Sequence, residues 1–219
     1  MEKDRTLGII DPASAAAVRR FARGALLLAL AASFAACARS PRLGGPGGAL
    51  APEEHVRLGT AYEEQGLRAE AAGQYEAAVR SDPACAECWL ALGNLAFTEG
   101  RLKEAGTCFR KARKASPGHA GAANNLAMVI LARNGSLPEA EALAQDALRN
   151  AGALKPYILD TLANIFLRER RYAEAAAAID QAEAAAPPEN GLMRGQLLET
   201  RKSIAIAAAG QPRAAGPVR

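Results

Sequence analysis

Aromatic residues are scarce in this chain of 219 residues: together they make up 5% of it, although half of the chain is hydrophobic. Alanine supplies most of the hydrophobic residues, far above its ordinary usage. A β-sandwich or β-barrel packs its sheet faces with branched and aromatic side chains, so this composition argues against both. Short helices that approach one another over small side chains fit it better, and we expect an all-α fold.

Groups for catalysis and metal binding are also few. The chain has two histidines and four cysteines, and it contains no nucleophile–base pair, phosphate-binding loop or paired-carboxylate motif. We therefore expect no enzyme active site, no cofactor, no bound metal and no small-molecule substrate.

The excess of basic over acidic residues is small. The chain has 27 basic and 23 acidic residues, which gives a net charge of +4. Residues 1–36 hold five of the basic and three of the acidic residues, so the remainder carries a net charge of +2. Because that remainder has no lysine cluster and no row of aromatic side chains, we expect no nucleic-acid binding.

A long hydrophobic run is missing. The uncharged apolar run over 24–36 has 13 residues, whereas a membrane-spanning helix needs roughly 20. Three arginines between 19 and 23 precede the run and small residues end it, an order typical of secretory signal peptides. We interpret 1–36 as an N-terminal extension and signal peptide, with translation starting at either Met1 or Val18.

The end of this run, Ala35-Ala36-Cys37, resembles the lipobox of bacterial lipoproteins, with Phe34 where that family usually has leucine. The resemblance implies cleavage before Cys37 and a lipid on its sulfur. By analogy with that family, Ala38 favours sorting to the outer membrane, facing the periplasm. The other interpretations are a signal peptide that is cleaved without lipidation and a retained anchor.

Glycine and proline mark a tether after the cysteine. Four glycines and two prolines lie between Ala38 and Leu50, and such a segment does not form a helix. We interpret 37–51 as the lipidated cysteine with a flexible linker, and 210–219 as a disordered tail.

A repeat fills most of the chain between these segments. Leu58-Gly59 recurs with spacings of 34, 34 and 36 residues, as Leu92-Gly93, Leu126-Ala127 and Leu162-Ala163. Small residues recur further along each unit, at Ala71, Ala105, Ala140 and Ala175. This period and these residue types, with Trp89-(x2)-Leu92-Gly93 in signature form, resemble the tetratricopeptide repeat family.

The resemblance implies a right-handed α-solenoid of about four helix-turn-helix repeats and a C-terminal capping helix. A single helix pair cannot bury its apolar face alone, so neighbouring pairs stack. We assign the repeat domain to 52–209, with its units at 52–85, 86–119, 120–155 and 156–189 and the cap at 190–209.

Glycines are expected in the turns of the first three units, at Gly66, Gly100 and Gly135, and Arg170-Arg171 replaces them in the fourth. On the cap, helical spacing predicts four inward apolar residues, Leu192, Leu197, Leu198 and Ile204. Charged residues are expected on its outer side, at Arg194, Glu199, Arg201 and Lys202.

Members of this family hold an extended peptide or a helix in a concave groove lined by the first helix of each pair. The resemblance places ten residues of this chain in that groove: Asn94, Phe97, Asn124, Met128, Leu131, Tyr157, Asp160, Asn164, Leu167 and Arg168. Their amides can bind a peptide backbone and their apolar members can form a floor. The alternative is that they pack and hydrogen-bond within the solenoid. The carboxylate clamp of some relatives is not supported, because Val56 stands where it needs a lysine.

Cys85 and Cys88 lie three residues apart at a repeat boundary. In an exported protein they are a candidate disulfide, and otherwise they are small buried hydrophobes. A zinc site with Cys108 and His119 is disfavoured by its irregular spacing. Attachment of c-type haem is excluded because Trp89, not histidine, follows the pair.

Together these features predict a membrane-anchored scaffold or adaptor lipoprotein of the bacterial cell envelope. It would bind a protein or peptide partner through its groove and assist assembly of an envelope, pilus or secretion complex. The alternative is a thiol-dependent or holdase-like periplasmic folding factor.

Overall fold

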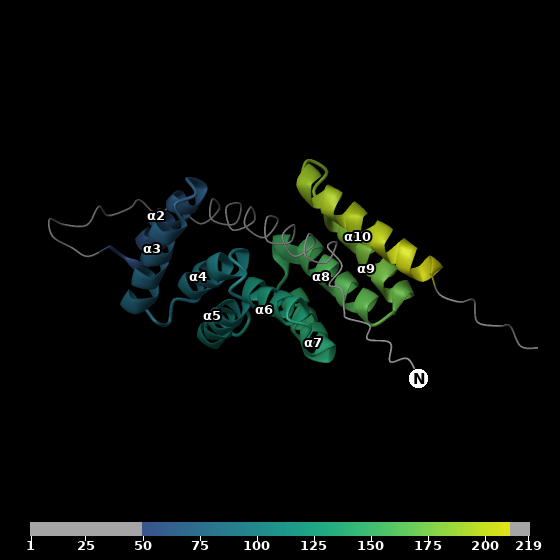
Figure 1. The fold of residues 1–219 in the computed structure, drawn as a ribbon, viewed down its shortest axis with the longest axis horizontal. Coiled ribbons are helices and arrows are strands. Elements are labelled where there is room, and N and C mark those ends of the chain that lie inside the picture. Colours follow the sequence, from purple (N-terminus) through teal and green to yellow (C-terminus); the bar gives the residue numbers. More distant parts are fainter. Residues whose placement is uncertain (1–49, 211–219) are drawn as a thin grey trace, which may run out of the picture.

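The computed structural model describes residues 50–210, which form nine α-helices and no β-strand within that range (Figure 1). Eight helices make four successive pairs: α2 (Pro52–Glu64) with α3 (Arg68–Ser81), α4 (Ala86–Thr98) with α5 (Leu102–Ala115), α6 (Ala120–Ala132) with α7 (Leu137–Leu148), and α8 (Lys155–Arg168) with α9 (Tyr172–Ala185). A short 3₁₀ helix, η1 (Gly152–Leu154), precedes α8, and α10 (Gly191–Ala209) follows the last pair. The all-α solenoid prediction is confirmed. The predicted signal peptide, the lipidation site Cys37 and the tail after Gly210 lie outside the described residues.

Each pair lies within the range predicted for its repeat, apart from α8, which begins at Lys155, one residue before the predicted boundary. The extra length of the third unit has two sources. Its turn covers residues 133–136, one residue more than the other turns, and η1 adds a short turn at its end.

The first helices form one row and the second helices another. Each of α2, α4, α6, α8 and α10 contacts the next member of this series, whereas α3, α5, α7 and α9 make at most marginal contact with one another. Because one row is closer together than the other, the stack curves toward the first helices. We call the solvent-facing surface of α2, α4, α6 and α8 the inner face.

Close approach of the two helices in a pair explains the recurrent small residue. A Cβ atom on Gly59 would lie 2.4 Å from the ring of Tyr75, and one on Gly93 would lie 2.5 Å from the ring of Phe109. Ala127 and Ala163 take the same place in the later pairs and are fully buried. The position therefore accepts little more than a hydrogen or a methyl group.

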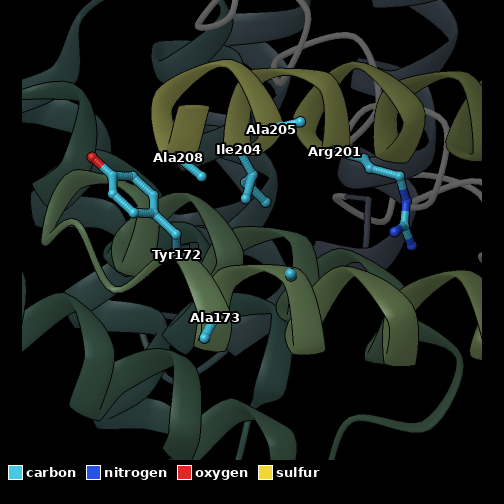
Figure 2. Close-up of a pocket in the computed structure, with 7 residues that line it drawn as sticks. Tyr172, Ala173, Arg201, Ile204, Ala205 and Ala208 are labelled. Atoms are coloured by element: carbon cyan, nitrogen blue, oxygen red, sulfur yellow. The ribbon is translucent and has the colours of Figure 1, made fainter. Parts of the chain in front are cut away.

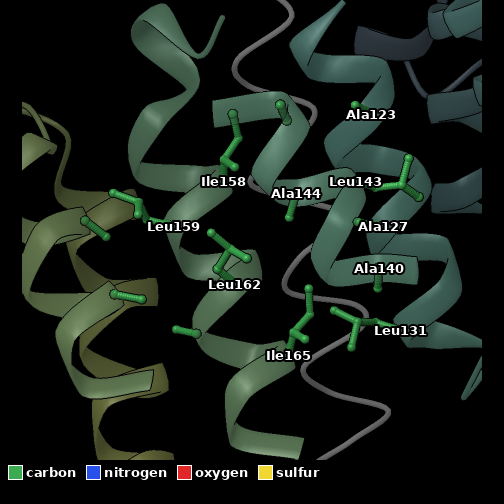
Figure 3. Packing of buried hydrophobic residues seen from close by; sticks show 14 of the residues in the cluster. Ala123, Ala127, Leu131, Ala140, Leu143, Ala144, Ile158, Leu159, Leu162 and Ile165 are labelled. Atoms are coloured by element: carbon green, nitrogen blue, oxygen red, sulfur yellow. The ribbon is translucent and has the colours of Figure 1, made fainter. Parts of the chain in front are cut away.

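Alanine fills the spaces between helices throughout the stack. One large cluster of buried residues extends from α4 to α10, and Figure 3 shows alanines of α6 and α7 beside α8, which carries leucines and isoleucines of the same cluster. A smaller cluster joins the first two pairs around Tyr75 and Leu95. Buried alanine lets helix backbones approach closely, which accounts for the unusual composition.

The turns within the pairs need a left-handed residue. Gly66 and Gly100 supply it with φ values of +77° and +76°. In the third turn Asn134 adopts this conformation rather than the expected Gly135, and in the fourth turn Arg170 does so. Asparagine tolerates the left-handed region better than most residues, because its short polar side chain can bond locally.

The inward face of the capping helix differs from the prediction. Leu197 and Ile204 are buried as expected, and Met193 and Thr200 complete that face. Leu192 and Leu198 are 54% and 47% exposed, so their predicted inward orientation is wrong. Leu198 occupies the repeat position of Gly93, which faces the second helix of its own pair. No second helix follows α10 in the described part of the chain, so Leu198 stays about half exposed.

Replacing Gly93 by alanine is expected to lower the free energy of unfolding by about 1–3 kcal/mol, because the added methyl group collides with the Phe109 ring. Gly73 in α3 is the matched control: it is exposed, and a Cβ there has no neighbour within 4 Å. Gly73→Ala is expected to stabilise by about 0.5–1 kcal/mol through helix propensity. Urea unfolding followed by circular dichroism measures both changes, and a change of the same sign in both would contradict the close-approach explanation.

Candidate functional site

The ten predicted groove residues all lie on the first helices α4, α6 and α8, but they differ in exposure. Six keep part of their surface open on the inner face: Asn94, Met128, Tyr157, Asn164, Leu167 and Arg168. Four are buried: Phe97, Asn124, Leu131 and Asp160. The prediction that these four line an open groove needs correction, because neighbouring side chains of the solenoid cover them.

Two of the three asparagines among the predicted groove residues use their side-chain amides within the solenoid. Asn125 Nδ2 donates a hydrogen bond to Asn94 Oδ1 across 2.8 Å, which links α6 to α4. Asn164 Nδ2 donates to the backbone oxygen of Asp160, one turn earlier in α8, at 2.8 Å. These bonds agree with the alternative interpretation, in which the asparagines form hydrogen bonds within the solenoid.

Asn124 differs from the other two. Its side chain is 6% exposed, and its Oδ1 atom is buried without a hydrogen-bond partner among the described residues. Its Nδ2 atom lies 3.5 Å from the sulfur of Met128. A buried carbonyl oxygen without a partner is uncommon in folded proteins, and here it lies on α6, in the middle of the inner row.

Helix α10 covers the C-terminal end of the inner row. Gln196 Nε2 donates to Asp160 Oδ2 at 2.7 Å, and Asn190 Nδ2 donates to the hydroxyl oxygen of Tyr157 at 3.1 Å. Sequence reasoning missed both Gln196 and Asn190, which is the N-cap residue of α10. The signal that could have found them is the repeat period, since Asn190 follows Tyr157 by 33 residues and Gln196 follows Asp160 by 36.

Arg168 also has a structural partner. Its Nη1 atom donates to the backbone oxygen of Leu131 at 2.7 Å and to Asn134 Oδ1 at 2.8 Å. It thereby satisfies a carbonyl group at the C-terminal end of α6, where helix carbonyls lack partners within the helix. Burial lowers the pKa of Arg168 from its ordinary value.

The remaining open surface of the inner face is apolar in its middle and acidic at its first pair. Half-buried apolar side chains come from three consecutive first helices, at Leu90, Met128, Tyr157 and Leu167. Exposed carboxylates lie on α2, at Glu53 and Glu64. A surface of this kind can hold an apolar segment across several repeats.

A shallow cleft of about 340 Å³ lies between α9 and α10, at the C-terminal end of the stack (Figure 2). It is lined mainly by small and apolar residues: Tyr172, Ala173, Ala176, Arg201, Ile204, Ala205 and Ala208. The guanidinium of Arg201 is held by Asp180 and Glu183 at 2.6 and 2.9 Å. The cleft thus lacks the converging polar groups of a catalytic site.

Metal binding and membrane crossing find no support in residues 50–210. That range holds no cluster of three or more histidine, cysteine or carboxylate side chains placed to share a metal ion. None of its helices combines the length and the apolar character needed to span a bilayer.

Two boundaries between repeats are held by side chains that cap helices. Cys85 precedes α4, and its sulfur accepts the backbone N–H of Cys88 at 3.1 Å and forms a disulfide with the Cys88 sulfur. His119 precedes α6, where Nδ1 accepts the backbone N–H of Ala122 and Nε2 lies 2.8 Å from Glu87 Oε1. The hydrogen bond to Glu87 raises the pKa of His119. These residues therefore order the junctions between repeats.

The sequence profile of the tetratricopeptide repeat family matches residues 56–120 and 107–154. The chain belongs to this family. The structure extends the repeats beyond the matched residues, because α8 and α9 form a further pair of the same kind. No curated protein matches the chain in a sequence search.

Several crystal structures share the tetratricopeptide fold. PilW, described as a widely conserved type IV pilus biogenesis factor, is 19% identical with a TM-score of 0.59, over 74% of this chain and 79% of PilW. The tetratricopeptide protein TTC0263 of Thermus thermophilus is 22% identical with a TM-score of 0.57, over 88% and 95% of the two chains. MamA is 15% identical with a TM-score of 0.53, over 69% and 95%. These likenesses show the fold.

The buried carboxyl group of Asp160 predicts a pH-dependent stability. Burial raises its pKa to about 6, although hydrogen bonds from Thr200 and Gln196 act in the opposite direction. The folded state therefore binds this proton more tightly than the unfolded state, whose pKa is 3.8. The resulting stabilisation is complete below pH about 4 and is lost as the pH rises to about 6, a change of about 3 kcal/mol.

Asp160→Asn is expected to flatten this dependence, because the amide has no charge to bury. Urea unfolding between pH 4 and pH 7 measures it. Asp180→Asn, at an exposed carboxylate of α9, is the control and should leave the decline in place. An unchanged slope in Asp160→Asn would assign the pH dependence to another group.

Thiol counting tests the pairing of Cys85 with Cys88. In a Cys37→Ser chain denatured without reductant, we expect one reactive thiol, from Cys108, and three after reduction. In the native chain Cys108 should react slowly, because it is buried and burial raises its pKa to about 11. Three thiols before reduction would contradict the disulfide.

Proposed function

We propose that this chain is a scaffold that binds a segment of a partner protein on its inner face, at the surface of a bacterial envelope membrane. The observation that carries the proposal is the row of half-buried apolar side chains on α4, α6 and α8. They continue from one repeat to the next along the stack, and apolar side chains left partly open are the usual anchors of a protein interface.

The partner segment should match both parts of the inner face. Leu90, Met128 and Leu167 favour apolar side chains in the middle of the bound segment. The carboxylates Glu53 and Glu64 favour lysine or arginine at the end that lies on α2. Methionine in the floor allows several side-chain shapes to be accepted.

The position at the membrane rests on the signal-peptide and lipobox resemblance around Cys37. The tether over 38–50 would then place the solenoid close to the lipid surface. The likeness to PilW, described as a type IV pilus biogenesis factor, supports a role in assembling a pilus or another envelope complex. We therefore propose that the present chain acts as a scaffold in such an assembly.

A thiol-dependent or holdase-like folding factor is the second candidate, favoured by the disulfide between Cys85 and Cys88. The two proposals differ in the number of partners. A scaffold yields one defined partner in fixed stoichiometry, and a folding factor captures many unfolded chains. Loss of binding after Cys85→Ser with Cys88→Ser would favour the folding factor.

Photo-crosslinking in cells tests the scaffold proposal. A photoreactive amino acid at Met128 or Leu167 is expected to crosslink one partner, because both side chains are partly open on the inner face. The same probe at Ala142 on α7 or Ala177 on α9, which are exposed on second helices, should give no such product. Equal crosslinking from both pairs of sites would contradict inner-face binding.

Two substitutions separate binding from folding and from anchoring. Met128→Lys should reduce the crosslink from Leu167 at least about tenfold by placing a charge on the apolar floor. Its control, Ala142→Lys, should leave the crosslink unchanged, and thermal melting of both verifies that they fold. Cys37→Ser should release the chain from the membrane fraction, and retention in that fraction would contradict lipid anchoring.

A further inference from the structure

Helix α10 carries an exposed stripe with coiled-coil spacing. Its members follow one another at alternating intervals of three and four residues: Leu192, Gly195, Glu199, Lys202, Ile206 and Ala209. All six are exposed, and the large apolar members Leu192 and Ile206 are 54% and 74% exposed. This interval is that of residues that face a partner helix in a coiled coil. We call these six residues the α10 stripe.

The stripe lies opposite the face that packs into the solenoid. The buried residues of α10 are Met193, Leu197, Thr200 and Ile204, which follow one another at a similar interval on the other side of the helix. Helix α10 therefore carries large apolar residues on two opposite sides, of which the stack uses one. Figure 1 shows α10 at the C-terminal end of the stack, after the last pair.

The stripe is complementary to itself when two copies run antiparallel. A two-fold axis between Thr200 and Arg201 places Leu192 opposite Ala209 of the second copy. It also places Gly195 opposite Ile206 and Glu199 opposite Lys202, each pairing occurring twice. Large side chains thus meet small ones and each carboxylate meets an ammonium group, which is the self-matching that a two-fold interface requires.

Other alignments lack this match. A parallel arrangement places Ile206 on Ile206, Gly195 on Gly195 and Glu199 on Glu199, so that large residues collide and like charges meet. Glu199 and Lys202 also pair within one copy at 2.9 Å. Across an antiparallel interface the two pairs become a network of four alternating charges.

We propose that the α10 stripe is a homodimer interface, in which α10 helices of two copies pack antiparallel about this two-fold axis. The inner face is formed by α2, α4, α6 and α8 and includes none of the stripe residues, so each copy in the dimer contributes its own partner-binding surface. A single pair of 19-residue helices is smaller than a standard stable interface, so we expect a Kd on the order of 10 μM.

Charge reversal tests the pairing of Glu199 with Lys202. Lys202→Glu and Glu199→Lys should each weaken dimerisation of the full chain at least about tenfold, because two attractive pairs become repulsive. The double variant Glu199→Lys with Lys202→Glu should restore it. A mixture of the two single variants should form heterodimers, since a stripe with two lysines then faces one with two glutamates. Sedimentation velocity in mild detergent, from 1 to 200 μM, measures all four cases.

Arg194→Glu is the matched control: it makes the same charge reversal at an exposed site of α10 outside the stripe. It should dimerise like the parent chain, and circular dichroism should show equal melting for all variants because the altered side chains are exposed. A parent chain that stays monomeric at 200 μM overturns the proposal. So does a double variant that stays as weak as the single ones, because the antiparallel pairing requires its recovery.

Discussion

The stack depends on the close approach of the two helices in each pair. At Gly59 and Gly93 the neighbouring aromatic ring lies where a side chain would otherwise begin, and the later pairs keep only a methyl group there. This contact brings the helices close enough for alanines to fill the remaining space, and it aligns the first helices into one row. Buried area per residue is small in such a structure, so stability comes from many shallow contacts shared between neighbouring repeats.

The C-terminal end of the stack is packed differently from its middle. Asp160 and Tyr157 lie on α8, the first helix of the last pair, where a further repeat would continue the row. Gln196 of α10 and its N-cap residue Asn190 bind them in place of such a repeat. The helix thus packs like the first helix of a fifth repeat, and residues 50–210 hold no second helix to complete the pair. That incomplete packing exposes Leu198, and together with the stripe on the far side it makes α10 the helix with the most unused apolar surface.

Polar groups on the inner row have two kinds of use. Asn94, Asn164 and Arg168 bond to neighbouring turns and helices, so substitutions there would alter the solenoid together with any bound partner. The half-buried apolar side chains of α4, α6 and α8 pack against the core on one side and stay partly open on the other. A partner that binds mainly through them can gain affinity while the hydrogen bonds between repeats stay intact.

The sequence alone determined the fold class, the helix pairs and the small residue at each close contact, because these depend on local spacing that repeats four times. The resemblance also located the inner helices. Only the tertiary structure decided which side chains remain open: Asn124 and Asp160 share repeat positions with groove residues, yet neighbouring side chains bury them. The same holds for Leu198, whose exposure depends on whether a second helix follows α10. Leu192 lies on the side of α10 opposite its buried face and is exposed for that reason. The exposure of a side chain depends on the helices that pack against it. The spacing of residues along one helix does not tell which helices these are.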